Sequence, residues 1–331
     1  MKVLVTGSQG FIGSYICQEL LNEGYNVIGV DDYSKYGVIS RYHDVHPKFK
    51  LYPINVISDD FIKCVENEKP DIIFAGAAKV GGVSYLNKYP YDLLATNENI
   101  TARTFDAAIN GFKKGYVKRI VIMSSSMVFE RTNTYPTSEN EIKYSLPPIS
   151  SYGFQKLATE YFAKAAFEQY GLEYSIVRPF NCVGVGEEKL YDESISGLTM
   201  SHVLPDLINK VLDGQSPLHI FGSGKQIRAY TNGKDLARGI RLVIESKMAV
   251  NEDFNISTPI TTTVLELAKL IWNKLRPNDP FEYISDPGFE YDVLQSIPDT
   301  TKSENILGFT PLISLEESIN EVLEYIIKNK K

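Results

Sequence analysis

A glycine-rich turn between a predicted strand and a predicted helix constrains the fold of this chain more than any other feature. The apolar run at residues 2–6 predicts a strand, and the amphipathic stretch at residues 11–23 predicts a helix. Between them lie Gly7, Gly10 and Gly13, with the spacing GxxGxxG. At such a turn the backbone can approach a pyrophosphate closely, and the helix N-terminus offers free N–H groups. We therefore predict a dinucleotide-binding turn.

Short runs of β-branched residues keep alternating with amphipathic stretches through the first half of the chain. Further strands are expected at residues 27–30, 72–75, 120–123 and 174–178, and further helices at residues 91–109 and 151–170. Such alternation is typical of repeated βαβ units, in which parallel strands are buried between helices. We predict an α/β fold, a Rossmann doubly wound parallel sheet with helices on both faces.

The pattern changes after Pro179, where glycines and prolines interrupt the chain and the helical periods become shorter. The later elements expected are a strand at residues 218–221, helices at residues 233–245, 263–275 and 315–327, and a mostly irregular segment at residues 277–298. We expect residues 1–179 to form a dinucleotide-binding domain, to which residues 233–260 return. Residues 180–232 and 261–331 are expected to form a smaller C-terminal substrate-binding lobe.

The composition is that of an ordinary globular protein, with 331 residues of which 43% are hydrophobic and 23% charged. A net charge of -7 without a basic stripe argues against binding nucleic acid or an acidic membrane surface. No apolar stretch reaches the ~18 residues of a membrane span, and no leader sequence is expected. Cys17, Cys64 and Cys182 are isolated thiols. We therefore expect a cytoplasmic protein without a structural metal.

Two aspartates at the end of the second predicted strand indicate which dinucleotide is bound. Asp31 follows Gly13 by 18 positions, close to the ~20 expected for a carboxylate that binds the adenosine ribose 2′-hydroxyl. Asp32 adds a second negative charge, and no Arg or Lys follows before Lys35. Because these carboxylates would repel the 2′-phosphate of NADP, we predict NAD as the cofactor.

A tyrosine and a lysine four residues apart form the predicted catalytic pair. Tyr152 and Lys156 lie at the start of the helix expected at residues 151–170, so their side chains share one face. A lysine ammonium beside a phenol stabilises the phenolate, which should lower the tyrosine pKa from about 10 toward the working pH. Tyr152 could then act as a general base on a substrate hydroxyl. Ser124–Ser126 end the strand expected at residues 120–123 and could hold the same oxygen.

These motifs, in this order, resemble the extended short-chain dehydrogenase/reductases of the NAD-dependent epimerase/dehydratase family, which act on nucleotide sugars. The resemblance runs from Met1 to about Phe309. The supporting motifs are Ala77-Ala78-Lys79-Val80-Gly81-Gly82, Asn97, Arg178-Pro179-Phe180-Asn181, and Phe221-Gly222-Ser223-Gly224 with Arg228.

The resemblance implies a role for each candidate site residue. Ser125, Tyr152 and Lys156 would be catalytic: the tyrosine is the acid/base, the lysine also contacts the nicotinamide ribose, and NAD takes a hydride from a sugar carbon, usually C4. Residues expected to contact NAD are Gly7, Gly10, Phe11, Ile12, Gly13, Asp31, Asp32, Asn55, Val56, Ala75, Gly76, Ala77, Asn97, Ser124, Tyr152, Lys156 and Pro179. Residues expected to contact a nucleotide-diphosphate sugar are Lys79, Ser125, Ser126, Asn181, His202, Val203, Phe221 and Arg228.

The residues after Ser125 separate the branches of the family. In 4,6-dehydratases an acid and a glutamate follow the serine position, whereas Ser126 and Met127 stand there in this chain. The stretches 77–82 and 201–205 look more like GDP-fucose synthase, and His202 matches its histidine, but Met127 replaces its cysteine. That enzyme also uses NADPH. In 4-epimerases a second arginine commonly precedes Gly-Asp-Val near residue 290, and the stretch 289–293 has none.

Three functions remain open. The first is a UDP-glucose 4-epimerase-like enzyme that acts on UDP-glucose, UDP-galactose or a related UDP-hexose through a transient 4-keto sugar. The second is an NAD(P)H-dependent 4-keto-sugar reductase or GDP-fucose-synthase-like epimerase/reductase, with His202 as proton donor. The third is a non-catalytic NAD-sensing regulator. The resemblance also implies a homodimer formed through the helices expected at residues 91–109 and 151–170.

Overall fold

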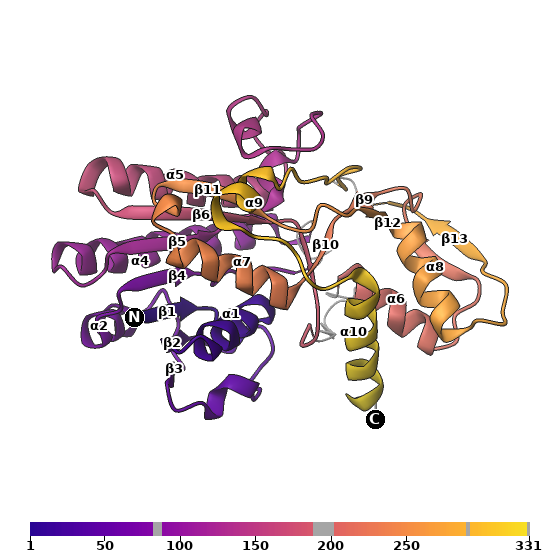
Figure 1. Cartoon of the computed structure of the whole chain (residues 1–331), viewed down its shortest axis with the longest axis horizontal. Coiled ribbons are helices and arrows are strands. Elements are labelled where there is room, and N and C mark those ends of the chain that lie inside the picture. Colours follow the sequence, from indigo (N-terminus) through magenta and orange to yellow (C-terminus); the bar gives the residue numbers. More distant parts are fainter. Residues whose placement is uncertain (82–87, 188–201, 289–291, 330–331) are drawn as a thin grey trace.

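A seven-stranded parallel sheet forms the centre of the structure (Figure 1). The computed structural model describes residues 1–81, 88–187, 202–288 and 292–329. The strands of the sheet are β1 (Lys2–Thr6), β2 (Asn26–Val30), β3 (Phe49–Tyr52), β4 (Ile72–Ala75), β5 (Arg119–Met123), β6 (Glu173–Pro179) and β11 (Glu252–Ile256). Their order is β11-β6-β5-β4-β1-β2-β3, and every neighbouring pair is parallel. The predicted Rossmann fold is confirmed.

Helices cover both faces of the sheet. The helices on one face are α1 (Phe11–Asn22) and α7 (Gly233–Glu245), and those on the other are α2 (Asp59–Glu68), α4 (Pro90–Lys113) and α5 (Ser151–Tyr170). Successive side chains of β1 point to opposite faces of the sheet: Val3 and Val5 pack toward α1, and Leu4 packs toward α2. Because both faces are covered, the middle residues of β1, β4 and β5 are apolar and buried, which gives each of these strands a short apolar run in the sequence.

A third hydrophobic cluster lies beside the sheet, among the helices grouped at one end of the molecule (Figure 1). It is built around Trp272 and includes residues of α6 (Val203–Leu212), α8 (Val264–Leu275) and α10 (Leu315–Asn329). The remaining elements are β7 (Asn181–Val183), β8 (Leu218–Phe221), β9 (Ile227–Arg228), β10 (Tyr230–Asn232), β12 (Thr262–Thr263), β13 (Tyr283–Asp286), α9 (Thr301–Leu307) and four 3-10 turns, η1 (Tyr42–Val45), η2 (Ser126–Phe129), η3 (Glu139–Lys143) and η4 (Lys247–Ala249). No helix in the described ranges is long and apolar enough to cross a membrane.

Several elements differ from the sequence-based expectations. The described part of residues 277–298 is mostly irregular, as expected, except for β13, which pairs in parallel with β8. Most of β13 is exposed, so its side chains show no alternation, and the strand depends on its pairing with β8. The edge strand β3 and the helix α2 were missed, and α4 continues to Lys113, beyond the predicted end at residue 109. Residues 252–256, within the segment 233–260, add β11 to the sheet beside β6.

A buried histidine near the start of the chain should make stability depend on pH. His43 in η1 is 1% exposed, and its ring lies edge-on to Phe49 at 4.6 Å between centroids. Burial lowers the pKa of His43 from 6.5 to about 4, although Asp44 opposes this change. The unfolded chain takes up the proton at a higher pH than the folded chain. The free energy of unfolding should therefore be greatest above pH 6.5 and should decrease as the pH drops toward 4.

The decrease assigned to His43 is at most about 3 kcal/mol. Urea unfolding between pH 7.5 and 4 measures it, with His43→Gln as the matched variant. Carboxylates contribute to both curves, so the difference between the two curves isolates the histidine. Identical pH dependences for the two proteins would contradict the prediction.

Candidate active site

A cavity of about 930 Å³ opens at the carboxyl ends of the central strands. The strand order reverses between β1 and β4, and in sheets of this kind ligands bind in the crevice at that switch point. Residues from both halves of the chain line the cavity. All residues expected to contact NAD or the sugar are among them except Ala75, Asn97 and Phe221. Among the described residues, no group of three or more His, Cys, Asp or Glu side chains is placed to hold a metal ion.

The glycine turn forms one wall of the cavity. Helix α1 begins at Phe11 with Gly10 as its N-cap, and the Gly10 N–H donates to the Gly7 carbonyl at 3.1 Å. Gly7 has a φ of +75°, which side chains rarely tolerate, and a Cβ on Gly13 would lie 1.9 Å from the Gly7 oxygen. The first turn of α1 therefore presents its N–H groups to the cavity without side chains in between. This cradle fits the pyrophosphate of a dinucleotide.

Gly13→Ala should disrupt this cradle. The added methyl group would overlap the Gly7 carbonyl, so the turn must open, at a cost of about 1–3 kcal/mol in the free energy of unfolding and about 10-fold in NAD affinity. Urea unfolding and NAD titration by calorimetry measure the two effects. Gly10→Ala is the matched control for stability, since its Cβ would lie 3.1 Å from the same oxygen and should cost less. Equal stability of the two variants would contradict the prediction.

The two aspartates after β2 are held by backbone groups and by Asn55. Asp31 accepts hydrogen bonds from the backbone N–H of Gln9 (2.9 Å) and of Tyr33 (2.8 Å), and burial raises its pKa. Asp32 accepts from the Asn55 side-chain amide at 2.7 Å. Both carboxylates line the same end of the cavity as the glycine turn, where an adenosine ribose would have to lie. The link between Asp32 and Asn55 connects the ends of β2 and β3.

Sequence reasoning missed Lys35 as a cavity residue. Burial, together with the nearby Arg41 guanidinium, lowers the pKa of Lys35 to about 8. Its ammonium lies 5.1 Å from the centre of the Tyr36 ring, which also lines the cavity. A lysine in an irregular loop has no sequence pattern that would have pointed to this position.

Ser125, Tyr152 and Lys156 meet at the carboxyl end of β5. Helix α5 begins at Ser151, and the Ser150 hydroxyl caps it by accepting from the Gly153 N–H at 3.0 Å. The Tyr152 hydroxyl hydrogen-bonds to the Ser125 side chain. The Lys156 ammonium donates to the Met123 carbonyl at 2.9 Å and lies 5.8 Å from the centre of the Tyr152 ring.

The prediction that Lys156 lowers the pKa of Tyr152 is wrong for this structure. Burial raises the pKa of Tyr152 above its ordinary value of 10, and the hydrogen bond with Ser125 offsets this only in part. Burial also lowers the pKa of Lys156 to about 8. The physical reason is that both groups are desolvated and that the ammonium is directed to the Met123 carbonyl.

Three residues expected at the site do not line the cavity. Asn97 is buried beneath it: its side chain accepts from the Lys79 N–H at 2.7 Å and donates to the Lys79 carbonyl at 3.0 Å, so it holds the backbone of a residue that does line the cavity. Ala75 packs against the apolar cluster under α4. Phe221 ends β8, with the Lys210 ammonium 4.8 Å from its ring centre. Gly82, the last residue of the motif at 77–82, lies outside the described residues.

The other end of the cavity carries the residues expected to hold the sugar nucleotide. Arg228 donates to Asp292 at 2.7 Å, a pairing that the sequence did not suggest. Asn181 in β7 lines the cavity near it. His202 is the N-cap residue of α6 and contacts the Glu187 carboxylate. Ser201 and residues 289–291, which were used to compare branches of the family, lie outside the described residues.

Short-chain dehydrogenase/reductases are the class of protein that this sheet and this cavity define. Within that class, the chain belongs to the NAD-dependent epimerase/dehydratase family, whose sequence model matches residues 3–257. Its cofactor is therefore NAD, as the aspartates after β2 predicted.

Individual relatives carry more than one activity. The chain is 27% identical to a putative UDP-glucose 4-epimerase of Methanocaldococcus jannaschii, over 99% of both proteins. It is 26% identical to UDP-glucuronic acid decarboxylase 1 of Danio rerio, over 98% of this chain and 72% of that protein. Among solved structures it is similar to the UDP-glucose 4-epimerase of Thermotoga maritima with UDP-glucose, with 30% identity, full coverage of both chains and a TM-score of 0.85.

Proposed function

We propose that this protein is a nucleotide-sugar 4-epimerase that interconverts UDP-hexoses such as UDP-glucose and UDP-galactose. The observation that carries the proposal is the hydrogen-bonded pair Ser125 and Tyr152, with Lys156 beside it, in a cavity that also contains the glycine turn. An acid/base next to a hydride acceptor can oxidise and re-reduce one carbon without further catalytic groups.

The carboxylates of the cavity support epimerisation over water elimination. Four of the described lining residues are carboxylates, and Asp31 and Asp32 belong to the adenosine end. Glu130 accepts from the backbone N–H groups of Ile149 and Ser150 just before α5, and Asp292 is paired with Arg228. Ser126 and Met127, which follow Ser125, have no acidic group. None of these described carboxylates is free to act as the acid of a dehydratase.

In the proposed reaction Tyr152 removes the proton of the C4 hydroxyl, and the Ser125 hydroxyl holds the same oxygen. NAD, when bound at the glycine turn, would supply the acceptor for the hydride that leaves C4. The 4-keto sugar turns over, is reduced on its opposite face, and receives the proton back from Tyr152. No net oxidation occurs, so no added cofactor should be consumed.

The sugar nucleotide would be held between the NAD-binding part of the chain and the C-terminal lobe. We place its diphosphate near Arg228, whose guanidinium has five donors and uses only some of them on Asp292 and on the Ile227 carbonyl. Asn181 and Lys79 would contribute further polar contacts. In this arrangement residues 1–179 and 233–260 hold NAD, and residues 180–232 and 261–331 hold the nucleotide sugar.

Purified protein incubated with UDP-galactose and no added NAD should form UDP-glucose. The same assay on UDP-N-acetylhexosamines and UDP-glucuronic acid would define the sugar. Release of carbon dioxide from UDP-glucuronic acid would show that the protein is a decarboxylase instead. Stoichiometric consumption of added NAD(P)H with a 4-keto sugar would show that it is a reductase that uses His202. Binding of NAD without turnover of any sugar would favour a regulator.

We also propose that the protein is a cytoplasmic homodimer. The support for a dimer is that α4 and α5 pack together and expose Tyr91, Phe154 and Tyr161 on their outer surface. The support for the compartment is that Cys17, Cys64 and Cys182 are free thiols. Light scattering of the purified protein tests the dimer: a mass of one chain at micromolar concentration would exclude it.

A further inference from the structure

Three side chains on one face of α5 contact three consecutive residues at the end of β5. Tyr152, Lys156 and Glu160 are spaced by four, so they lie one above another along the helix. Glu160 accepts a hydrogen bond from the Ser124 hydroxyl at 2.6 Å. Tyr152 and Lys156 bond to the residues that flank Ser124, at the Ser125 side chain and the Met123 carbonyl. The helix and the strand end are thus joined by three successive polar contacts.

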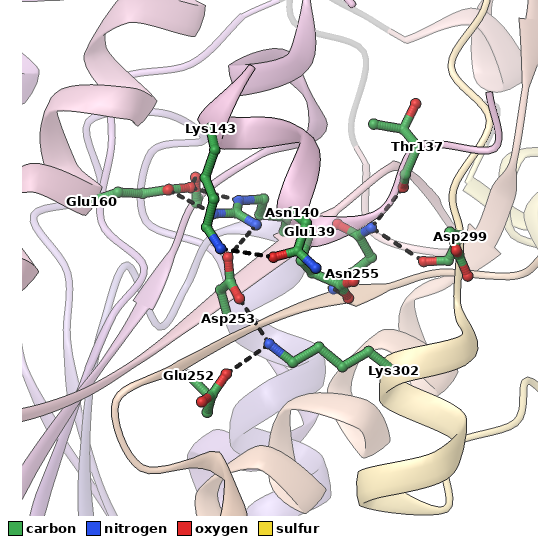
Figure 2. Close-up of polar contacts among 12 residues, drawn as sticks. Thr137, Glu139, Asn140, Lys143, Glu160, Glu252, Asp253, Asn255, Asp299 and Lys302 are labelled. Carbon is green, nitrogen blue, oxygen red and sulfur yellow. Dashed lines mark hydrogen bonds and ion pairs between the residues drawn. The ribbon is translucent and has the colours of Figure 1, made fainter. Parts of the chain in front are cut away.

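Glu160 belongs to an ionic network that extends through Arg178 to Asp253 and Lys302 (Figure 2). Glu160 and Arg178 are both 0% exposed, and the guanidinium donates to the two carboxylate oxygens at 2.8 and 2.7 Å. Arg178 also pairs with Asp253 of β11 at 2.7 Å, and Asp253 accepts from Lys302 at 2.9 Å. Since the fork of Arg178 sets the plane of the Glu160 carboxylate, the oxygen that meets Ser124 has a defined position.

Small side chains make up part of the apolar contact of α5. Beyond Glu160, Ala163 and Ala166 are buried in the apolar cluster on this face of the sheet, and Phe162 is partly buried beside them and stacks on Phe105 of α4. The directional contact between Glu160 and Ser124 adds to this packing in resisting small shifts of the helix along β5. Displacements on the order of 1 Å at a catalytic group can cost about 100-fold in rate.

We propose that Glu160 is a positioning residue: through Ser124 on one side and Arg178 on the other, it holds α5 in the register that brings Tyr152 to Ser125. The assignment of Tyr152 as the acid/base rests on the proposed function. The position of Tyr152 does not, because it can be observed without turnover. Glu160 itself touches neither the cavity nor the proposed reacting atoms.

Glu160→Gln tests the proposal, because it keeps the size of the side chain but replaces one acceptor of Arg178 by a donor. We expect kcat for sugar interconversion to fall about 10- to 100-fold with KM changed less than about 2-fold. Asp253→Asn is the matched control: it weakens a carboxylate on the same arginine without contacting Ser124, so kcat should stay within about 2-fold of wild type. Equal losses of kcat in both variants would show that Glu160 has a purely structural role and would overturn the proposal.

A second readout does not depend on the substrate. 3-Fluorotyrosine placed at position 152 should give one ¹⁹F resonance in the holoenzyme, with the same shift in Asp253→Asn and a displaced or broadened line in Glu160→Gln. If the wild type turns over no UDP-hexose, the proposed function fails while this spectrum still tests the positioning. If Glu160→Gln does not fold, Ser124→Ala replaces it, since it removes the contact and keeps the buried ion pair. An unchanged ¹⁹F line in the variant examined overturns the proposal.

Discussion

Tyr152→Phe should lower kcat for sugar interconversion about 1,000-fold while the protein keeps its fold and its NAD. Removing the hydroxyl eliminates the proton acceptor and donor for C4, and general acid–base groups typically contribute about 100- to 10,000-fold. The phenyl ring stays, so the packing of α5 against η2 should hardly change. Activity on UDP-galactose, NAD content of the purified protein and the unfolding temperature measure the three parts of this prediction.

The matched control is Tyr161→Phe on the same helix. Tyr161 is 66% exposed and does not line the cavity, so its hydroxyl should not matter for turnover. A Tyr152→Phe variant with more than about a tenth of wild-type kcat would show that another group transfers the proton, and a comparable loss in Tyr161→Phe would point to a general effect on the helix.

Arg178→Met should lower the free energy of unfolding by about 3–5 kcal/mol, because it leaves the buried Glu160 carboxylate without its partner. The guanidinium is fully enclosed and contacts both Glu160 and Asp253, so neither water nor a neighbouring cation can replace it. Urea unfolding at pH 7 measures the effect.

Lys302→Met is the control for Arg178→Met. Lys302 occupies the outer end of the same network, where its side chain is 26% exposed, and such partly solvated ion pairs contribute up to about 1 kcal/mol. If the two variants lose similar amounts of unfolding free energy, the buried pair of Arg178 and Glu160 contributes no more to stability than the ion pair of Lys302 at the surface.

Features encoded in neighbouring residues could be predicted from the sequence. The central strands are buried on both faces, so their apolar runs identified the parallel sheet. The glycine turn and the Tyr152–Lys156 pair depend on the spacing of residues that are close in the sequence. The strand β3 was missed because it is only partly buried, and β13 because it is largely exposed; both take their conformation from a neighbouring strand. Their residues alone do not favour a strand strongly enough to be recognised.

Features that depend on packing between distant segments could not be predicted. The pairing of Arg228 with Asp292 joins residues 64 positions apart. The shift of the Tyr152 pKa was misjudged because desolvation depends on how fully the folded chain encloses the phenol, which the YxxxK motif does not encode. Lys35 reaches the cavity from an irregular loop and left no periodic signal.

Strand β11 has a consequence for exchanging parts between members of the family. The outermost strand beside β6 comes from residues 252–256, and it carries Asp253, the second ion-pair partner of Arg178. A chimera in which everything after Pro179 came from a relative would place the relative's strand against β6. The Arg178 guanidinium would then face whatever residue that strand carries in place of Asp253. Grafting a new sugar specificity onto this scaffold would therefore require two separate inserts, with the native chain retained through α7 and β11.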